Sequence, residues 1–228
     1  MQINIPKVAS VSGLAGTTII VLGSIITASA YEGRAGESYS LLNHFISELG
    51  EVGVSELARV FNTCLFTGGL GLTVFLLGLA GYLGGRFGLL YGLVGLVTGV
   101  SGSLVGVFPM NNLATHVAVA SLFFRMGLVA TALFSIYVLF VRQDKFPKWT
   151  SIPGVLTVSC FISYLTIGIL TLPPGRVLAL PAHFKRPDIW LVPLFEWTVF
   201  LSVLFWVVVV SLYLYRQQKN LKQPGALG

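Results

Sequence analysis

Residues 87–108 read FGLLYGLVGLVTGVSGSLVGVF, an apolar run with the length that a helix needs to cross a bilayer. Its glycines recur every three or four residues, so on a helix they lie in one stripe: Gly88, Gly92, Gly95, Gly99, Gly102 and Gly106. Small residues let membrane helices approach one another closely. The stretch therefore predicts a helix packed tightly against a neighbour. The preceding apolar run is also rich in glycine, and we expect the two runs to form a hairpin that turns at Gly84-Gly85.

Further apolar runs of similar length flank this stretch on both sides. Together they predict six membrane-spanning helices, roughly at residues 8–30, 58–84, 87–108, 113–141, 152–172 and 193–215. The chain has 228 residues, of which 55% are hydrophobic and 10% are charged. A soluble domain carries about 25% charged residues. We therefore expect an all-α, polytopic membrane protein in which residues 1–228 form a single integral membrane domain, a bundle of six helices.

The expected orientation accounts for the net charge of +6. Cytoplasmic loops of membrane proteins are enriched in Lys and Arg. If both termini are cytoplasmic, the inner segments carry eight Lys and Arg against one acid, and the outer segments carry five against seven. We expect this orientation, in the cytoplasmic (inner) membrane. No run of Lys and Arg interleaved with aromatic residues points to nucleic acid. The expected partners are membrane lipids and other membrane protein subunits.

A polar stretch, NHFISELG, occupies residues 43–50 in the first outer loop. Read as a helix, it pairs Asn43 with Ser47 and His44 with Glu48 at a spacing of four residues, on the face opposite its apolar side chains. The pattern predicts a short amphipathic helix that is too short to span a bilayer. Its polar face is the first part of a candidate site.

All three histidines fall on the predicted outer side, in three different segments. Ionisable residues at membrane depth are costly and point to function by default. We expect one outward-facing polar pocket formed by Asn43, His44, Ser47, Glu48, Asn112, His116, His183, Asp188 and Glu196. Arg125 is the one charge deep inside a predicted span. Glu196 is its best partner by depth, and we expect the two to form a structural ion pair.

Three interpretations of this pocket are open. His44, His116 and His183, with Glu48 or Asp188, would supply the ligands of a catalytic zinc, and Ser47 or a bound water would be the nucleophile. Against this, no H-x-x-x-H or H-E-x-x-H pair is present. The same residues would instead tie loops to helix ends by hydrogen bonds. In the third interpretation His44, Asn43 and Asn112, with Arg176, Lys185 or Arg186, would bind a lipid head group.

The two polar stretches resemble the signatures of a known family. NHFISELG after a first span is similar to the H-x-I-S-E-L-G signature of the bacterial and archaeal membrane proteins called domain of unknown function 998. Val107-Phe108-Pro109-Met110-Asn111, followed by His116, resembles the second signature, which more often has Asp where this chain has Asn111 or Asn112. The autophagy-modulator (DRAM-like) proteins are a more distant likeness. The resemblance implies six helices and an outward polar cluster, with no established reaction.

The leading functional hypothesis is a non-enzymatic membrane protein that binds a lipid or serves as an accessory or assembly subunit, with an extracytoplasmic polar pocket. It needs no cofactor. The first alternative is a metal-dependent hydrolase that acts on a lipid head group or ester, with zinc as its cofactor. The second alternative is a transporter of a small solute or ion. A carrier would usually have acidic residues near the middle of the membrane, and the predicted spans have none there.

Overall fold

The computed structural model describes residues 4–141, 144–171 and 186–221, with side chains as far as residue 218. In these ranges, six helices are long and apolar enough to cross a membrane. The chain is thus an all-α integral membrane protein. The spanning helices are α1 (Ile5–Ser29), α2 (Ala58–Leu83), α3 (Gly85–Val107), α4 (Leu113–Ile136), α5 (Ser151–Thr171) and α6 (Leu191–Leu221). Shorter helical turns are η1 (Ile46–Gly50), η2 (Met110–Asn112), η3 (Tyr137–Val141) and η4 (Lys148–Thr150).

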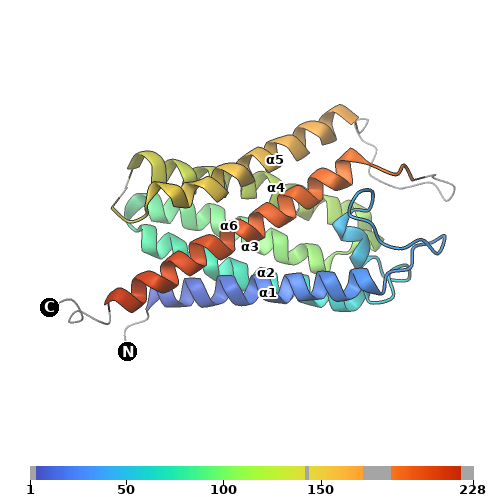
Figure 1. Cartoon of the computed structure of the whole chain (residues 1–228), viewed down its shortest axis with the longest axis horizontal. Coiled ribbons are helices and arrows are strands. Elements are labelled where there is room, and N and C mark those ends of the chain that lie inside the picture. Colours follow the sequence, from blue (N-terminus) through green and yellow to red (C-terminus); the bar gives the residue numbers. More distant parts are fainter. Residues whose placement is uncertain (1–3, 142–143, 172–185, 222–228) are drawn as a thin grey trace.

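The six long helices form a closed ring. Each packs against the next one along the chain, and α6 closes the ring by packing against α1 as well as α5. Figure 1 shows that α1 begins and α6 ends at the same end of the bundle, which we call the terminal end. The segment that joins α1 to α2 covers the opposite end, which we call the loop end. The ring surrounds a cavity that side chains from all six long helices line.

The glycine stripe of α3 lies mainly against α2. A methyl group added at Gly95 would come within 3.0 Å of Leu76 Cβ, and one at Gly99 within 2.7 Å of Thr73 Cα. One at Gly106 would come within 2.9 Å of the Phe66 nitrogen. Gly102 differs, because it faces Phe123 of α4 at 3.0 Å. The turn between the helices is at Gly84 and Gly85, whose φ angles of 71° and 59° favour glycine.

Most glycines of α2 face α1, which differs from the expected match with the α3 stripe. Gly68, Gly71 and Gly78 would each meet α1 if they carried a side chain, and only Gly69 meets Ser103 of α3. The physical reason is that α2 lies between two neighbours in the ring and needs small residues on both faces. The sequence pattern gave no means of assigning each glycine to a face.

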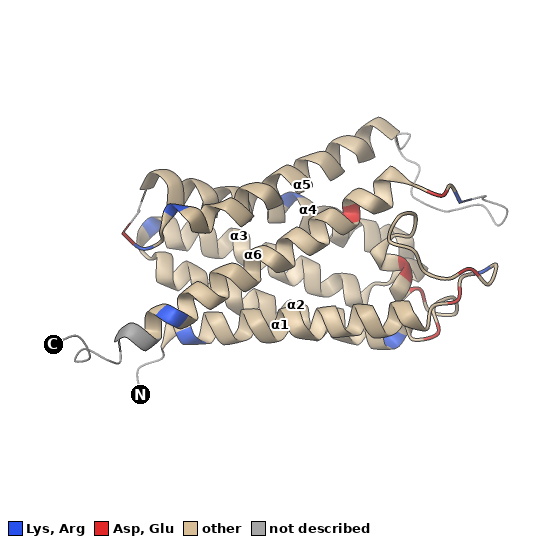
Figure 2. Cartoon of the chain, viewed as in Figure 1, with Lys and Arg blue, Asp and Glu red and all other residues tan. Residues whose placement is uncertain are grey.

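The balance of charge differs between the two ends (Figure 2): Lys and Arg predominate at the terminal end, where Asp144 is the only described acid, and the loop end carries glutamates together with Arg34, Arg59 and Arg186. The terminal end carries basic residues, among them Lys7, Arg86, Lys145, Lys148 and Arg216. The loop end carries the glutamates of the segment between α1 and α2, namely Glu32, Glu37, Glu48, Glu51 and Glu56. The candidate site lies at this acidic loop end.

Candidate functional site

The amphipathic helix of the loop is shorter than predicted. Only Ile46–Gly50 is helical, as the 3-10 turn η1, and residues 41–45 form a turn instead. The cause is that two backbone carbonyls of this turn bind side chains: the Tyr39 hydroxyl donates to Phe45 O at 2.9 Å, and Trp197 Nε1 donates to His44 O at 3.2 Å. His44 therefore does not stack above Glu48 as the helical spacing predicted.

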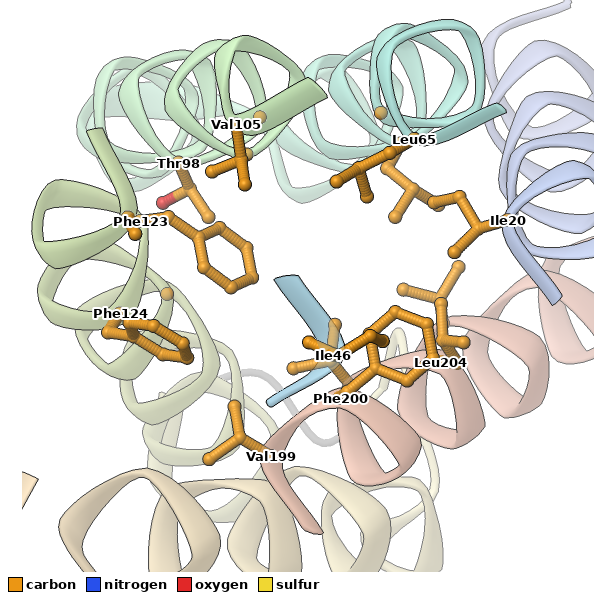
Figure 3. Close-up of a pocket in the computed structure, with 18 of the residues that line it drawn as sticks. Ile20, Ile46, Leu65, Thr98, Val105, Phe123, Phe124, Val199, Phe200 and Leu204 are labelled. Atoms are coloured by element: carbon orange, nitrogen blue, oxygen red, sulfur yellow. The ribbon is translucent and has the colours of Figure 1, made fainter. Parts of the chain in front are cut away.

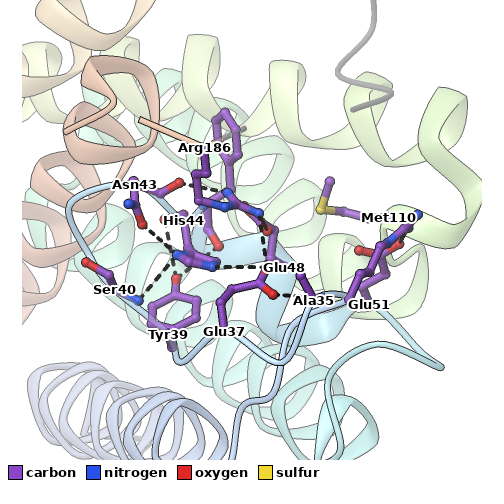
Figure 4. A network of polar contacts seen from close by, with 12 residues as sticks. Ala35, Glu37, Tyr39, Ser40, Asn43, His44, Glu48, Glu51, Met110 and Arg186 are labelled. Carbon is purple, nitrogen blue, oxygen red and sulfur yellow. Dashed lines mark hydrogen bonds and ion pairs between the residues drawn. The ribbon is translucent and has the colours of Figure 1, made fainter. Parts of the chain in front are cut away.

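Glu48 forms the central ion pair of the loop end, with Arg186 (Figure 4). Arg186 donates from Nη1 to Glu48 Oε1 at 3.1 Å and from Nη2 to Oε2 at 2.8 Å. The same guanidinium donates to Asn43 O at 2.8 Å, and Glu48 Oε1 also accepts the Phe45 N–H. Only 5% of the Glu48 side chain is exposed. Burial raises the pKa of its carboxyl, although the Arg186 guanidinium opposes that effect.

His44 is buried beside this ion pair, with 2% of its side chain exposed. Its Nδ1 lies 2.8 Å from Asn43 Oδ1, whose amide nitrogen is held by Pro187 O, and the Ser40 N–H donates to the same Nδ1 at 3.3 Å. A protonated Nδ1 donates to Asn43, whereas an unprotonated Nδ1 accepts from Ser40. Nε2 has no hydrogen-bond partner among the residues that the structure describes, and it lies 3.9 Å from Glu37 Oε1. Burial, together with the nearby Arg186 charge, lowers the pKa of His44 to about 4. The ring is therefore neutral at physiological pH.

Aromatic side chains that the sequence reading did not single out surround His44. Tyr31 and Tyr39 lie with their ring centroids 5.5 and 5.1 Å from its ring. Trp197 of α6 donates to the Tyr39 hydroxyl at 3.1 Å and thereby joins the loop to α6. Glu37 was also not among the site residues predicted from the sequence. No local pattern marks them, since their partners are distant in sequence.

Two further contacts fasten the loop over the ends of the helices. The Asn111 side chain pairs with the backbone of Val52, accepting its N–H and donating to its carbonyl, both at 2.9 Å. Glu196 Oε2 accepts the Ile46 N–H at 2.9 Å. Glu196 is consequently not in an ion pair with Arg125, as the sequence predicted, because its carboxylate holds η1 against α6. Residues 43–52, Asn111 and the described stretch 186–196 thus meet at the loop end.

Ser47, His116 and Glu196 lie below the loop network, where they line two cavities. The Ser47 hydroxyl contacts Met110 Sδ at 3.3 Å, a weak acceptor. His116 Nδ1 lies 2.8 Å from Phe108 O, so this nitrogen carries the proton and donates. The predicted pocket is thus divided into a closed network around His44 and Glu48 and a second group that faces the cavities.

The first cavity, which we call the lateral pocket, lies between α4, α5 and α6 and has a volume of about 440 Å³. Its walls are mostly apolar side chains, including Val117, Phe124, Leu165 and Ile169. Arg125 also lines it and is exposed. Among the described residues, Arg125 takes part in none of the ion pairs. The pocket therefore combines mostly apolar walls with a cation that forms no ion pair to any described residue, although Glu196 also lines the pocket.

The second cavity, which we call the central cavity, lies on the axis of the helix ring and has a volume of about 120 Å³. Figure 3 shows apolar side chains from across the ring pointing into it, with Ile46 of η1 across one end. Towards the terminal end, Phe75 and Trp206 also line it. Its threonines, Thr98 and Thr131, bond to carbonyls of their own helices at 2.9 and 2.8 Å. The cavity interior is therefore apolar in character.

Other predicted site residues lie apart from the cavities. Asn112 caps the N-terminus of α4 and accepts from Thr115 N, and the Asp188 side chain is exposed. His183 lies outside the described residues, as do Arg176 and Lys185. In the described part of the chain, no three His, Cys, Asp or Glu side chains are grouped as a metal site would require. The zinc site built on His44, His116 and His183 stays a prediction.

Comparison with known proteins identifies a family whose description assigns no function. No curated protein matches the chain, and no solved structure does. The likeness to the autophagy-modulator proteins stays a prediction from the sequence. A family model described as protein of unknown function (DUF998) matches residues 14–213, which is most of the chain, and the protein therefore belongs to this family.

Proposed function

We propose that the protein is a non-enzymatic, lipid-binding protein that holds the anionic head group of a membrane amphiphile in the lateral pocket. The observation that carries the proposal is the position of Arg125. It lies twelve residues after Leu113 and eleven before Ile136, at the middle of α4. It lines a pocket whose other walls are mostly apolar. An anionic amphiphile supplies both a counter-ion for Arg125 and an apolar chain that suits the apolar walls.

The energetic argument concerns the cost of the arginine. A charged side chain at the middle of a membrane helix costs roughly 2.5–3.5 kcal/mol on insertion scales. In the described part of the chain no carboxylate forms an ion pair with Arg125 to offset that cost, because Glu196 bonds to Ile46. Residues kept at such a cost usually bind something. A phosphate or a carboxylate would accept the guanidinium donors in its fork geometry.

The surroundings of Arg125 also fit an amphiphile better than a small ion. The pocket volume of about 440 Å³ falls within the range of roughly 300–1,000 Å³ typical of small-molecule sites. Tyr164 and Ser121 line it with hydroxyl groups, and Ser47 and His116 lie where it meets the loop. These groups can donate hydrogen bonds to head-group oxygens. The excess of Lys and Arg at the terminal end supports an orientation with the loop end extracytoplasmic and both termini cytoplasmic.

Binding to the purified protein in a neutral detergent tests this proposal. The probes are hexadecanoate, hexadecyl phosphate and hexadecanol, and the readout is thermal unfolding at rising probe concentration. We expect both anionic probes to stabilise the protein more than the alcohol does. The better of the two identifies the source of the negative charge. Equal stabilisation by all three probes would show that a negative charge on the ligand does not matter, which would contradict binding to Arg125.

The matched variants are Arg125→Gln and Arg86→Gln. Arg86 is an exposed cation at the start of α3, remote from the lateral pocket. A hydrogen-bonded charge is worth about 1.5–3 kcal/mol, so Arg125→Gln is expected to weaken anionic binding by roughly tenfold to hundredfold. Arg86→Gln is expected to bind like the native chain. Unchanged binding by Arg125→Gln would contradict the proposal.

A further inference from the structure

We infer that the apolar tail of the bound amphiphile leaves the lateral pocket between α4 and α6 and ends in the central cavity, against Trp206. This inference rests on the proposed function, and it adds where the tail lies and which ligands fit. It predicts a ligand with a single unbranched alkyl chain, because the helix ring encloses the space that receives the tail.

The two cavities adjoin each other. Ser47, His116, Ala120, Phe124 and Glu196 line both of them, so these side chains form the shared wall. Ala120 is the smallest of the five, and it is half-buried on α4. A tail that passes from one cavity to the other must cross this wall, and the methyl side chain of Ala120 leaves the most room.

The interior of the central cavity suits a hydrocarbon better than water. Both of its threonine hydroxyls are satisfied by carbonyls of their own helices. The polar groups Ser47, His116 and Glu196 lie on the shared wall, and Trp206 adds a buried indole N–H that has no hydrogen-bond partner among the described residues. Cavities lined by apolar groups stay dry and take apolar guests, and one of roughly 150 Å³ accepts benzene. The central volume of about 120 Å³ thus holds about five carbon atoms of a chain.

The position of the charge gives the direction of binding. Arg125 is exposed and lines only the lateral pocket, whereas Phe75 and Trp206 line only the central cavity. Trp206 is buried and stacks edge-on against Phe75 and Phe134, with ring centroids 5.8 and 5.5 Å away. An amphiphile with its head group at Arg125 therefore has its terminal carbons near a fixed indole ring.

Positional quenching of tryptophan fluorescence tests the inference. The probes are hexadecanoate brominated at its terminal carbon and hexadecanoate brominated beside its carboxylate, each added to the full chain in neutral detergent at mildly alkaline pH. Bromine quenches an indole that it touches. We expect the terminal bromine to quench more strongly than the other bromine, and we expect Trp206→Phe to lose that extra quenching. Trp149, Trp190 and Trp197 do not line the central cavity and provide the constant background.

Ala120→Leu is the blocking variant, and Gly168→Ala is its matched control. Gly168 also lines the lateral pocket, and a methyl group added there would meet no atom of the described residues within 4 Å. We expect Ala120→Leu to lose the extra quenching by the terminal bromine while the probe still stabilises the protein against heat. Gly168→Ala should retain both effects. If Ala120→Leu does not fold, Thr131→Leu replaces it, because the larger side chain fills the central cavity from α4. This variant should likewise lose the extra quenching while the probe still stabilises it.

The outcomes separate this inference from the proposed function. If the native chain is stabilised by both brominated acids but both quench equally, the tail lies elsewhere and the inference is overturned, whereas anionic binding stands. The same conclusion follows if Trp206→Phe retains the extra quenching. If neither acid stabilises the native chain, the proposed function itself fails.

Discussion

Protonation of His44 is expected to destabilise the protein, and the structure gives the size of the effect. The pKa of His44 is lowered from 6.5 to about 4, because the ring is buried and lies near Arg186. In the unfolded chain the ring takes up its proton as the pH falls through 6.5, whereas in the folded chain it does so only near pH 4. The stability due to the neutral ring is thus complete above pH 6.5 and is lost as the pH falls towards 4. At 1.36 kcal/mol per pH unit, the full loss is about 3 kcal/mol.

Unfolding by sodium dodecyl sulfate in mixed micelles measures this loss, at a series of pH values from neutral to acidic. The control is His44→Gln, whose amide keeps a donor for Asn43 Oδ1 but does not titrate in this range. Other carboxyl groups at the loop end, including Glu37 and Glu48, titrate in both proteins. The difference between the two pH profiles therefore reports on residue 44 together with its contact to Glu37, whose Oε1 lies 3.9 Å from His44 Nε2. Parallel profiles would refute the reasoning, as would a native chain that gains stability relative to the variant in acid.

Two further predictions concern packing and charge. Arg186→Met should destabilise the protein by about 3–5 kcal/mol in the same unfolding assay, because it leaves the Glu48 carboxylate buried without its partner. Glu48→Gln with Arg186→Met should cost less than Arg186→Met alone, and a larger cost for the double variant would contradict a buried-charge penalty. Gly99→Ala should cost about 1–3 kcal/mol, because the added methyl group would come within 2.7 Å of Thr73 Cα, whereas Gly168→Ala should be neutral or stabilising. Equal thermal stability of these two glycine variants would disprove close packing of α2 and α3.

The spans were predictable because their signal is local. Twenty apolar residues in a row have few stable arrangements in a bilayer other than a helix, since every backbone group must find a hydrogen-bond partner within the segment. The structure follows the predicted spans closely, although α6 continues six residues beyond residue 215. The glycine spacing was equally informative about α3. The same spacing did not predict how α1 packs, although Gly16 and Gly23 of α1 also lie close to α2.

The site was predictable only in part, for the same reason. The residue types at the loop end were evident from the sequence, but the helical spacing paired His44 with Glu48 wrongly. In the structure Glu48 binds Arg186, which is 138 residues away. Several cations were chemically equivalent candidates for such a contact. Which of them reaches Glu48 depends on how the chain enters α6.

By itself, the amino-acid sequence determined that the chain is an all-α membrane protein with a polar segment after its first helix. Hydrophobicity and small-residue spacing act between near neighbours, so they can be read from the chain directly. Only the tertiary structure decided that α6 closes the ring against α1, that Glu196 holds η1, that Arg125 forms no ion pair within the described ranges, and that two adjoining cavities lie beneath the loop. These features depend on how distant segments pack, because a cavity is the space that several helices fail to fill together.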